Sequence, residues 1–136
     1  MAWTRTATLA LVAATVAVGG YALLQRAGAS EPYGLLPYTD PEAIATGRTV
    51  YAEHCAACHG ENLEGAPDWR SRDADGYLPA PPHDETGHTW HHPAEQLFLL
   101  TKFGVEPFAP EGYESDMPAY QDTLTNRQIW GAIAFI

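Results

Sequence analysis

The segment Cys55-Ala56-Ala57-Cys58-His59 holds the residues of this sequence best suited to chemistry. Its two thiols lie three positions apart and a histidine follows directly, which is the C-x-x-C-H pattern of c-type haem attachment. On one helical turn both thiols can form thioethers to the haem vinyl groups, while the imidazole faces the iron. The sequence therefore predicts one haem c, bound covalently through Cys55 and Cys58, with His59 as an iron ligand.

Three other interpretations of the cysteine pair remain open at this point. A disulfide between Cys55 and Cys58 would close too small a loop to add much stability. A thioredoxin-type redox pair follows a strand, whereas a helical pattern precedes Cys55. A zinc site would use both cysteines and two later histidines, and no second C-x-x-C follows. Haem attachment is the interpretation that the pattern favours.

Three short helices are expected to position this motif. The first begins at the N-cap Asp40 and ends near His54. The second covers about 93–104, and the third opens at Thr125 with Gln128 completing a capping box. No strand pattern competes with them, so the sequence predicts an all-α domain.

Two long irregular stretches, 60–92 and 105–124, are rich in proline and glycine. Irregular segments of this length in a compact domain indicate that the chain wraps a site or a cofactor. Three short helices also bury little apolar area for a soluble chain of about 105 residues. A large apolar prosthetic group would complete such a core.

Residues 6–25 carry no charge and consist mainly of alanine, valine and leucine. About 20 helical residues span roughly 30 Å, which is enough to cross a bilayer. We expect 1–25 to be a signal or anchor helix, with a transmembrane anchor favoured and a cleaved signal peptide as the alternative. Residues 26–39 would be a linker, and 40–136 would be a domain on the periplasmic side of a bacterial inner membrane, or soluble in the periplasm after cleavage.

The soluble part of the chain is strongly acidic. All 17 acidic residues follow residue 30, where five cationic residues lie, which gives this part a net charge of −12. This charge argues against nucleic acid as a partner, because a phosphate backbone requires a basic surface. The acidic face is either simply solvated or docks to a basic surface on a partner protein.

The order of these features resembles the class I cytochromes c. A helix carrying Gly47 and Tyr51 leads into CAACH, a later loop reads SDMPAY, and a terminal helix ends in an aromatic residue. The resemblance covers 40–136 and implies three or four short helices around a covalently attached haem. It also implies a methionine from the late loop as the second iron ligand, and Met117 is the only methionine besides Met1. The alternative role for Met117 is to fill a gap in the core.

The resemblance implies two further structural roles. Gly47 would let the first and last helices cross closely, with Tyr51 and Phe135 packed at the crossing. Pro81 or Pro82 would offer a backbone carbonyl to the outer nitrogen of His59. Such a bond fixes the orientation of a ligand ring and raises its basicity.

The segment from His83 to His92 departs from the commonest pattern of the family, because it contains four histidines and two carboxylates. It could bind a second metal such as copper or zinc, place Trp90 or a histidine against the haem propionates, or cap the helix at Pro93. A histidine from this segment on the iron would replace Met117 and lower the reduction potential.

These features predict a monohaem cytochrome that carries single electrons between membrane redox complexes of a respiratory or photosynthetic chain. Such a carrier has no small-molecule substrate and no catalytic residue. The alternatives are a haem subunit fixed in a larger oxidase or dehydrogenase complex, and a small peroxidase or gas sensor. In the last case Met117 would leave the iron.

Overall fold

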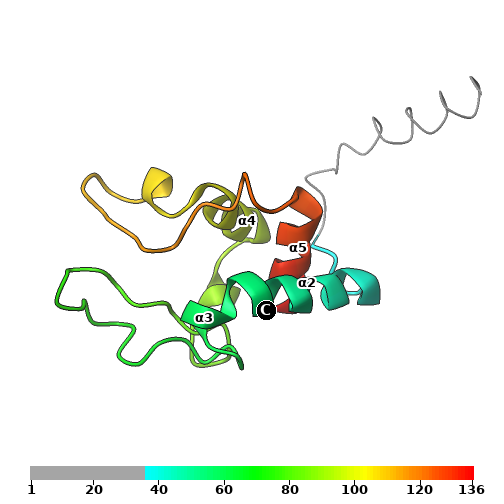
Figure 1. Ribbon diagram of the computed structural model, residues 1–136, viewed down its shortest axis with the longest axis horizontal. Helices are drawn as coiled ribbons and strands as arrows, with labels where there is room; N and C mark the ends of the chain where they lie inside the picture. Colours follow the sequence, from blue (N-terminus) through cyan, green and yellow to red (C-terminus); the bar gives the residue numbers. More distant parts are fainter. Residues whose placement is uncertain (1–35) are drawn as a thin grey trace, which may run out of the picture. The chain divides into compact units, whose positions relative to one another are not determined.

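The computed structural model describes residues 36–136, and the regular structure of this part is entirely helical (Figure 1). Residues 1–35 lie outside the described part, and with them the expected signal or anchor helix and most of the expected linker. The described elements are α2 (Pro41–His54), α3 (Ala56–His59), η1 (Thr89–His91), α4 (Ala94–Phe103), η2 (Glu106–Phe108) and α5 (Asn126–Phe135), where η1 and η2 are 3-10 turns. The all-α prediction is therefore confirmed for 36–136.

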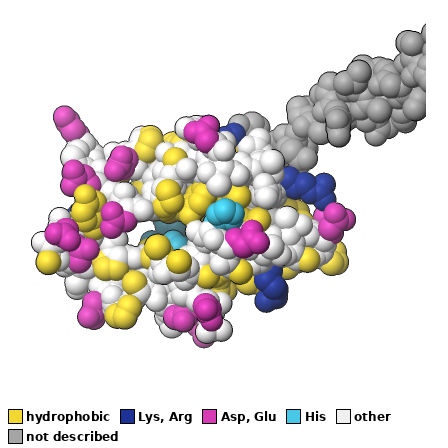
Figure 2. Space-filling view, viewed as in Figure 1, with side chains coloured by type: hydrophobic (Ala, Val, Ile, Leu, Met, Phe, Trp, Pro, Cys, Tyr) yellow, Lys and Arg dark blue, Asp and Glu magenta, His cyan; other side chains and the backbone are white. Residues whose placement is uncertain are grey.

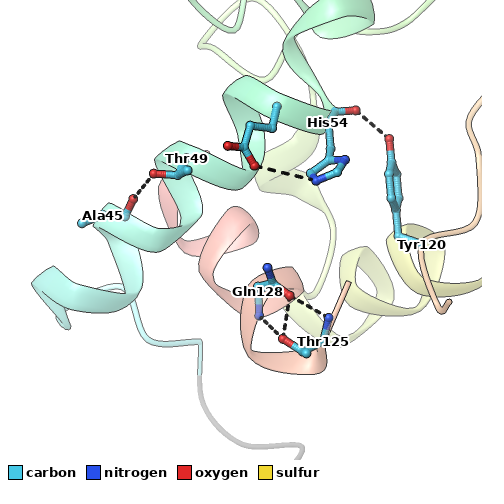
Figure 3. Close-up of polar contacts among 7 residues, drawn as sticks. Ala45, Thr49, His54, Tyr120, Thr125 and Gln128 are labelled. Atoms are coloured by element: carbon cyan, nitrogen blue, oxygen red, sulfur yellow. Dashed lines mark hydrogen bonds and ion pairs between the residues drawn. The ribbon is translucent and has the colours of Figure 1, made fainter. Parts of the chain in front are cut away.

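Two of the helices begin where capping residues predict. The side chain of Asp40 accepts a hydrogen bond from the backbone N–H of Glu42 at 3.0 Å, so α2 starts at Pro41. At α5 the hydroxyl of Thr125 accepts from the backbone N–H of Gln128 at 3.3 Å, and the Gln128 side chain accepts from the backbone N–H of Thr125 at 2.9 Å (Figure 3). Both predicted helix starts are confirmed.

Helices α2 and α5 cross with their backbones in direct contact. A Cβ atom added to Gly47 would overlap the carbonyl oxygen of Gly131, and one added to Gly131 would lie 2.9 Å from the carbonyl oxygen of Ala43. The rings of Tyr51 and Phe135 pack beside the crossing with their centroids 5.5 Å apart. The predicted close crossing is confirmed, and Gly131 is a partner that the sequence analysis did not identify.

Helix α4 completes the core. It begins one residue after Pro93 and ends before Gly104, whose φ of +81° is readily adopted only by glycine. Its residue Phe98 is 1% exposed and stacks on Trp130 of α5 with ring centroids 4.6 Å apart, next to the fully buried Ile129. These contacts hold α4 against α5.

Two long connections, which we call the early loop (60–88) and the late loop (104–125), extend on the same side of the α2–α5 pair (Figure 1). In the early loop the backbone N–H of Ala66 donates to the carbonyl of Ala80 at 2.8 Å, and that of His83 donates to the carbonyl of Leu63 at 2.7 Å. The two ends of the early loop are therefore bonded to each other, and residues 67–79 form an excursion between them.

Within the described residues, no helix is long and apolar enough to cross a membrane. The segment for which the sequence predicts a membrane helix, 1–25, lies outside them.

Candidate haem-binding site

The junction of α2 and α3 places the C-x-x-C-H segment on one turn. Cys55 ends α2 with its N–H bonded to the carbonyl of Tyr51 at 2.9 Å, and its own carbonyl accepts from the N–H groups of Cys58 at 3.1 Å and His59 at 2.9 Å. Both thiols are free, with Cys55 partly buried and Cys58 exposed. Two thiols and a histidine are thus presented together from one compact turn.

His59 is oriented by a bond from the early loop. Its Nδ1 lies 2.8 Å from the carbonyl oxygen of Pro81, and since a carbonyl only accepts, Nδ1 carries the proton and donates. The other ring nitrogen, Nε2, keeps its lone pair for a metal. Burial lowers the pKa of His59, which favours the neutral ring, and the bond to Pro81 opposes part of that shift. Of the two prolines considered from the sequence, Pro81 supplies the carbonyl.

The histidine His83 contacts His59, which the sequence analysis did not anticipate. The two imidazoles stack with centroids 4.3 Å apart and planes 22° apart. Nδ1 of His83 lies 2.7 Å from the hydroxyl oxygen of Thr89. Burial, followed by the neighbouring His59 and His88, lowers the pKa of His83 to about 4. Only the histidine-rich composition of the segment pointed to it.

The late loop, which carries Met117, is tied to the attachment segment through Tyr120. The phenol of Tyr120 donates to the backbone carbonyl of His54 at 2.7 Å, directly before Cys55 (Figure 3). The backbone N–H of Tyr120 also donates to Thr101 of α4 at 3.2 Å. Met117 precedes Tyr120 by three residues, and its side chain is partly buried. The structure thus joins the two segments on which the predicted iron ligands lie.

Residues 42–136 match the family described as cytochrome C oxidase, cbb3-type, subunit III. The chain belongs to this family. It is also 61% identical over 28 residues to the "Cbb3-type cytochrome c oxidase subunit CcoP" of Azospirillum brasilense, a match that covers 21% of this chain and 10% of that protein. No solved structure matches the chain.

Membership of the cbb3 subunit III family confirms a monohaem c-type cytochrome with covalently bound haem c, and Cys55 and Cys58 have the spacing for its attachment. The rival interpretations of the cysteines also find no support in the geometry. The pair is not joined in a disulfide, and a helix rather than a strand precedes it. Burial, with a smaller contribution from Cys58, raises the pKa of Cys55 to about 11, the opposite of the lowered pKa of a redox-active thiol.

The residues of this cbb3-family domain fit a large apolar group between the two loops. In the stretch 55–93 Pro82 is the only buried residue, and in the late loop Gly104 and Leu124 are the only two. Figure 2 shows a hollow in the surface of the domain, with a histidine side chain inside it and hydrophobic side chains around it. The loops therefore lack a core of their own, as the sequence analysis expected.

Three rings of the histidine-rich segment lie at the surface, namely those of His88, Trp90 and His91. Trp90 is 68% exposed and stacks on His91 with centroids 3.7 Å apart, while His88 stacks on Trp69 at 5.4 Å. Among residues 36–136 no group of three or more His, Cys, Asp or Glu side chains is arranged to hold a metal ion. The second-metal interpretation thus gains no support, and no side chain makes a capping bond at the start of α4.

Proposed function

We propose that this chain transfers single electrons to or from a membrane oxidase, with His59 and Met117 as the two axial ligands of its haem iron. Bound haem c supplies one-electron redox chemistry at the iron. The protein contributes a fixed ligand set, because His59 and Met117 would hold the iron in both oxidation states. The observation that carries the proposal is the His59–Pro81 bond, which leaves Nε2 free on the same turn as both thiols.

The contact between Tyr120 and His54 supports Met117 as the second ligand, because it draws the late loop to the attachment segment. Pro118 follows Met117 and restricts the backbone beside it. A thioether ligand favours the reduced iron and so raises the reduction potential.

The axial ligands are tested by visible and near-infrared spectra of the oxidised protein. We expect a sulfur-to-iron charge-transfer band in the wild type, its loss in Met117→Ala, and its retention in the matched control Glu114→Gln from the same loop. The reduced wild type should resist carbon monoxide, whereas Met117→Ala should bind it. Carbon monoxide binding by the wild type would instead indicate a peroxidase or gas sensor with an open iron.

The partner is proposed to present a basic docking surface. Four carboxylates from the two loops lie close enough to Tyr77 to raise its pKa, namely Glu114, Asp116, Asp73 and Glu106, with Glu114 contributing most. Acidic side chains also outnumber basic ones on the face in Figure 2. Attraction between opposite charges speeds encounter and weakens as salt rises.

This docking surface is tested by electron-transfer rates at increasing ionic strength. Glu114→Lys should slow the reaction at low salt, and the difference from wild type should vanish at high salt. Glu53→Lys, an exposed change of the same charge on α2, is the control. Equal effects of both variants would show that only net charge matters and would overturn a defined docking surface.

A second candidate is a subunit held permanently in a cbb3-type oxidase, which the family match and the CcoP relative favour. In either case we propose that 1–25 anchor the chain, with 40–136 in the periplasm. Detergent but not high salt should then release the protein from membranes. Detergent-solubilised protein that migrates with oxidase subunits would favour the permanent subunit, and protein that migrates alone would favour the mobile carrier.

A further inference from the structure

We propose that His83 is a positioning residue for His59, which holds the plane of the ligand ring by stacking against it. The inference rests on the proposed role of His59 as an iron ligand. It assigns a function to one member of the histidine-rich segment, where the sequence left three possibilities open.

The His59–Pro81 bond leaves one aspect of the ligand unfixed. Nδ1 of His59 lies 2.8 Å from the carbonyl oxygen of Pro81. A single hydrogen bond at the edge of a ring still allows the ring plane to tilt about that contact. The ring of His83 lies 4.3 Å from that of His59 and within 22° of parallel, so it covers one face of the ligand. A tilt toward that face would bring the two rings into collision.

His83 can resist such a collision because it is itself held. Its backbone N–H donates to the carbonyl of Leu63 at 2.7 Å, and its Nδ1 lies 2.7 Å from the hydroxyl oxygen of Thr89. The same hydroxyl donates to the carbonyl of Pro82 at 3.5 Å. The edge of Tyr51 approaches from α2 with ring centroids 6.4 Å apart. Backbone, side chain and neighbouring helix therefore all constrain the His83 ring.

One short segment delivers both contacts to the ligand. Pro81 supplies the carbonyl and His83 the stacked ring, and the buried Pro82 between them restricts the backbone. Gly87 lets the loop close here, because a Cβ at that position would overlap the carbonyl oxygen of Pro82. Outer contacts that orient a metal ligand tune the metal, so we expect His83 to affect the electronic state of the haem.

Histidine suits this position better than an apolar residue of similar size. Leucine would fill the volume but offers neither a flat face nor a bond to Thr89. Phenylalanine retains the flat face and loses only the bond. These differences separate a stacking role from mere filling of the core.

The test compares the purified holoprotein of wild type with His83→Leu, His83→Phe and Thr89→Val. The haem-methyl resonances in the proton NMR spectrum of the oxidised protein report the orientation of the axial imidazole plane, and potentiometry reports the reduction potential. We expect His83→Leu to redistribute these resonances and shift the potential, Thr89→Val to do so less, and His83→Phe to restore most of the wild-type pattern. His91→Leu, at an exposed position of the same segment, should change neither.

The double variant His83→Leu/Thr89→Val should shift the resonances no further than His83→Leu alone, because Thr89 acts through His83. A His83→Leu holoprotein with wild-type resonances and potential would overturn the inference and leave the proposed function intact. If His83→Leu yields no holoprotein, unchanged resonances in the near-isosteric Thr89→Val would overturn it instead. Wild-type protein without the spectrum of a methionine-ligated haem would refute the proposed function itself.

Discussion

The α2–α5 pair and the two loops around the proposed haem site are held together by different means. The helices touch backbone to backbone at Gly47 and Gly131, and both contribute buried side chains to the core, among them Tyr51 and Ile133. The early and late loops bury few residues and are held mainly by hydrogen bonds, such as those from His59 to Pro81 and from Tyr120 to His54. We therefore expect the loops to depend on the cofactor more strongly than the helix pair does.

The largest effect is expected when the haem attachment is removed. Cys55→Ser/Cys58→Ser should carry no covalent haem, and its loops should lose structure, because the stretch 55–93 buries only Pro82. Acidified organic solvent tests for covalent haem, and amide hydrogen exchange compares the loops with α2 and α5.

The conservative change Ala57→Ser, between the two thiols, should keep both haem and loop protection. If the loops of the haem-free double variant stayed protected from hydrogen exchange, the loops would not depend on haem more than the helix pair does.

Gly47→Ala is expected to destabilise the protein by about 2 kcal/mol, because its Cβ meets the carbonyl of Gly131 and forces the helices apart. Helix propensity alone would make the alanine variant more stable by about 1 kcal/mol. The sign of the change in the free energy of unfolding therefore distinguishes the two effects. Gly131→Ala should cost less, since its Cβ would lie 2.9 Å from the nearest atom. Denaturant unfolding measures both variants.

Ala45→Gly, at an exposed position of α2, measures the effect of helix propensity on stability by itself. A Gly47→Ala protein at least as stable as wild type would show that the crossing tolerates a side chain.

Tyr120→Phe is expected to cost about 1 kcal/mol, because it removes the hydrogen bond from the phenol to the carbonyl of His54. Hydrogen exchange in the late loop should rise more than in α2 or α5. Tyr38→Phe, at a site 68% exposed, is the control and should leave both measurements unchanged. Equal exchange in loop and helices would mean that this bond does not tie the loop to the attachment segment.

The smallest expected effect appears at alkaline pH. Burial is the main reason that the pKa of Tyr51 rises from 10.0 to about 12. Between these values the unfolded chain loses the proton that the folded chain retains, so the free energy of unfolding falls as pH rises. This slope should be shallower in Tyr51→Phe and unchanged in Tyr38→Phe. The same slope in all three proteins would place the alkaline sensitivity elsewhere.

The helices were predictable because their signals are local. Asp40 and Thr125 bond to backbone N–H groups within three residues, so the caps can be identified in the sequence without knowledge of the rest of the fold. The α3 turn and the 3-10 turns were not predicted as separate elements, because a single turn leaves no periodic pattern.

The haem site was predictable only in part. The C-x-x-C-H segment places its chemistry on one turn, and Pro81 was one of two candidates for the bond to His59. Contact of Trp90 or a histidine with the haem propionates was one of three possibilities for the histidine-rich segment and stays a prediction, while the structure places Trp90 at the surface against His91. Which residues of a long loop face inward depends on its path, and proline- and glycine-rich segments have no periodicity that reveals it.

The sequence by itself determined the helix boundaries and the covalent attachment of haem, because each depends on residues a few positions apart. Only the tertiary structure decided that Gly131 faces Gly47, that Pro81 rather than Pro82 bonds His59, and that His83 stacks on His59. These contacts join residues more than 20 positions apart in the chain. Their formation depends on how helices and loops pack together, which local patterns do not encode.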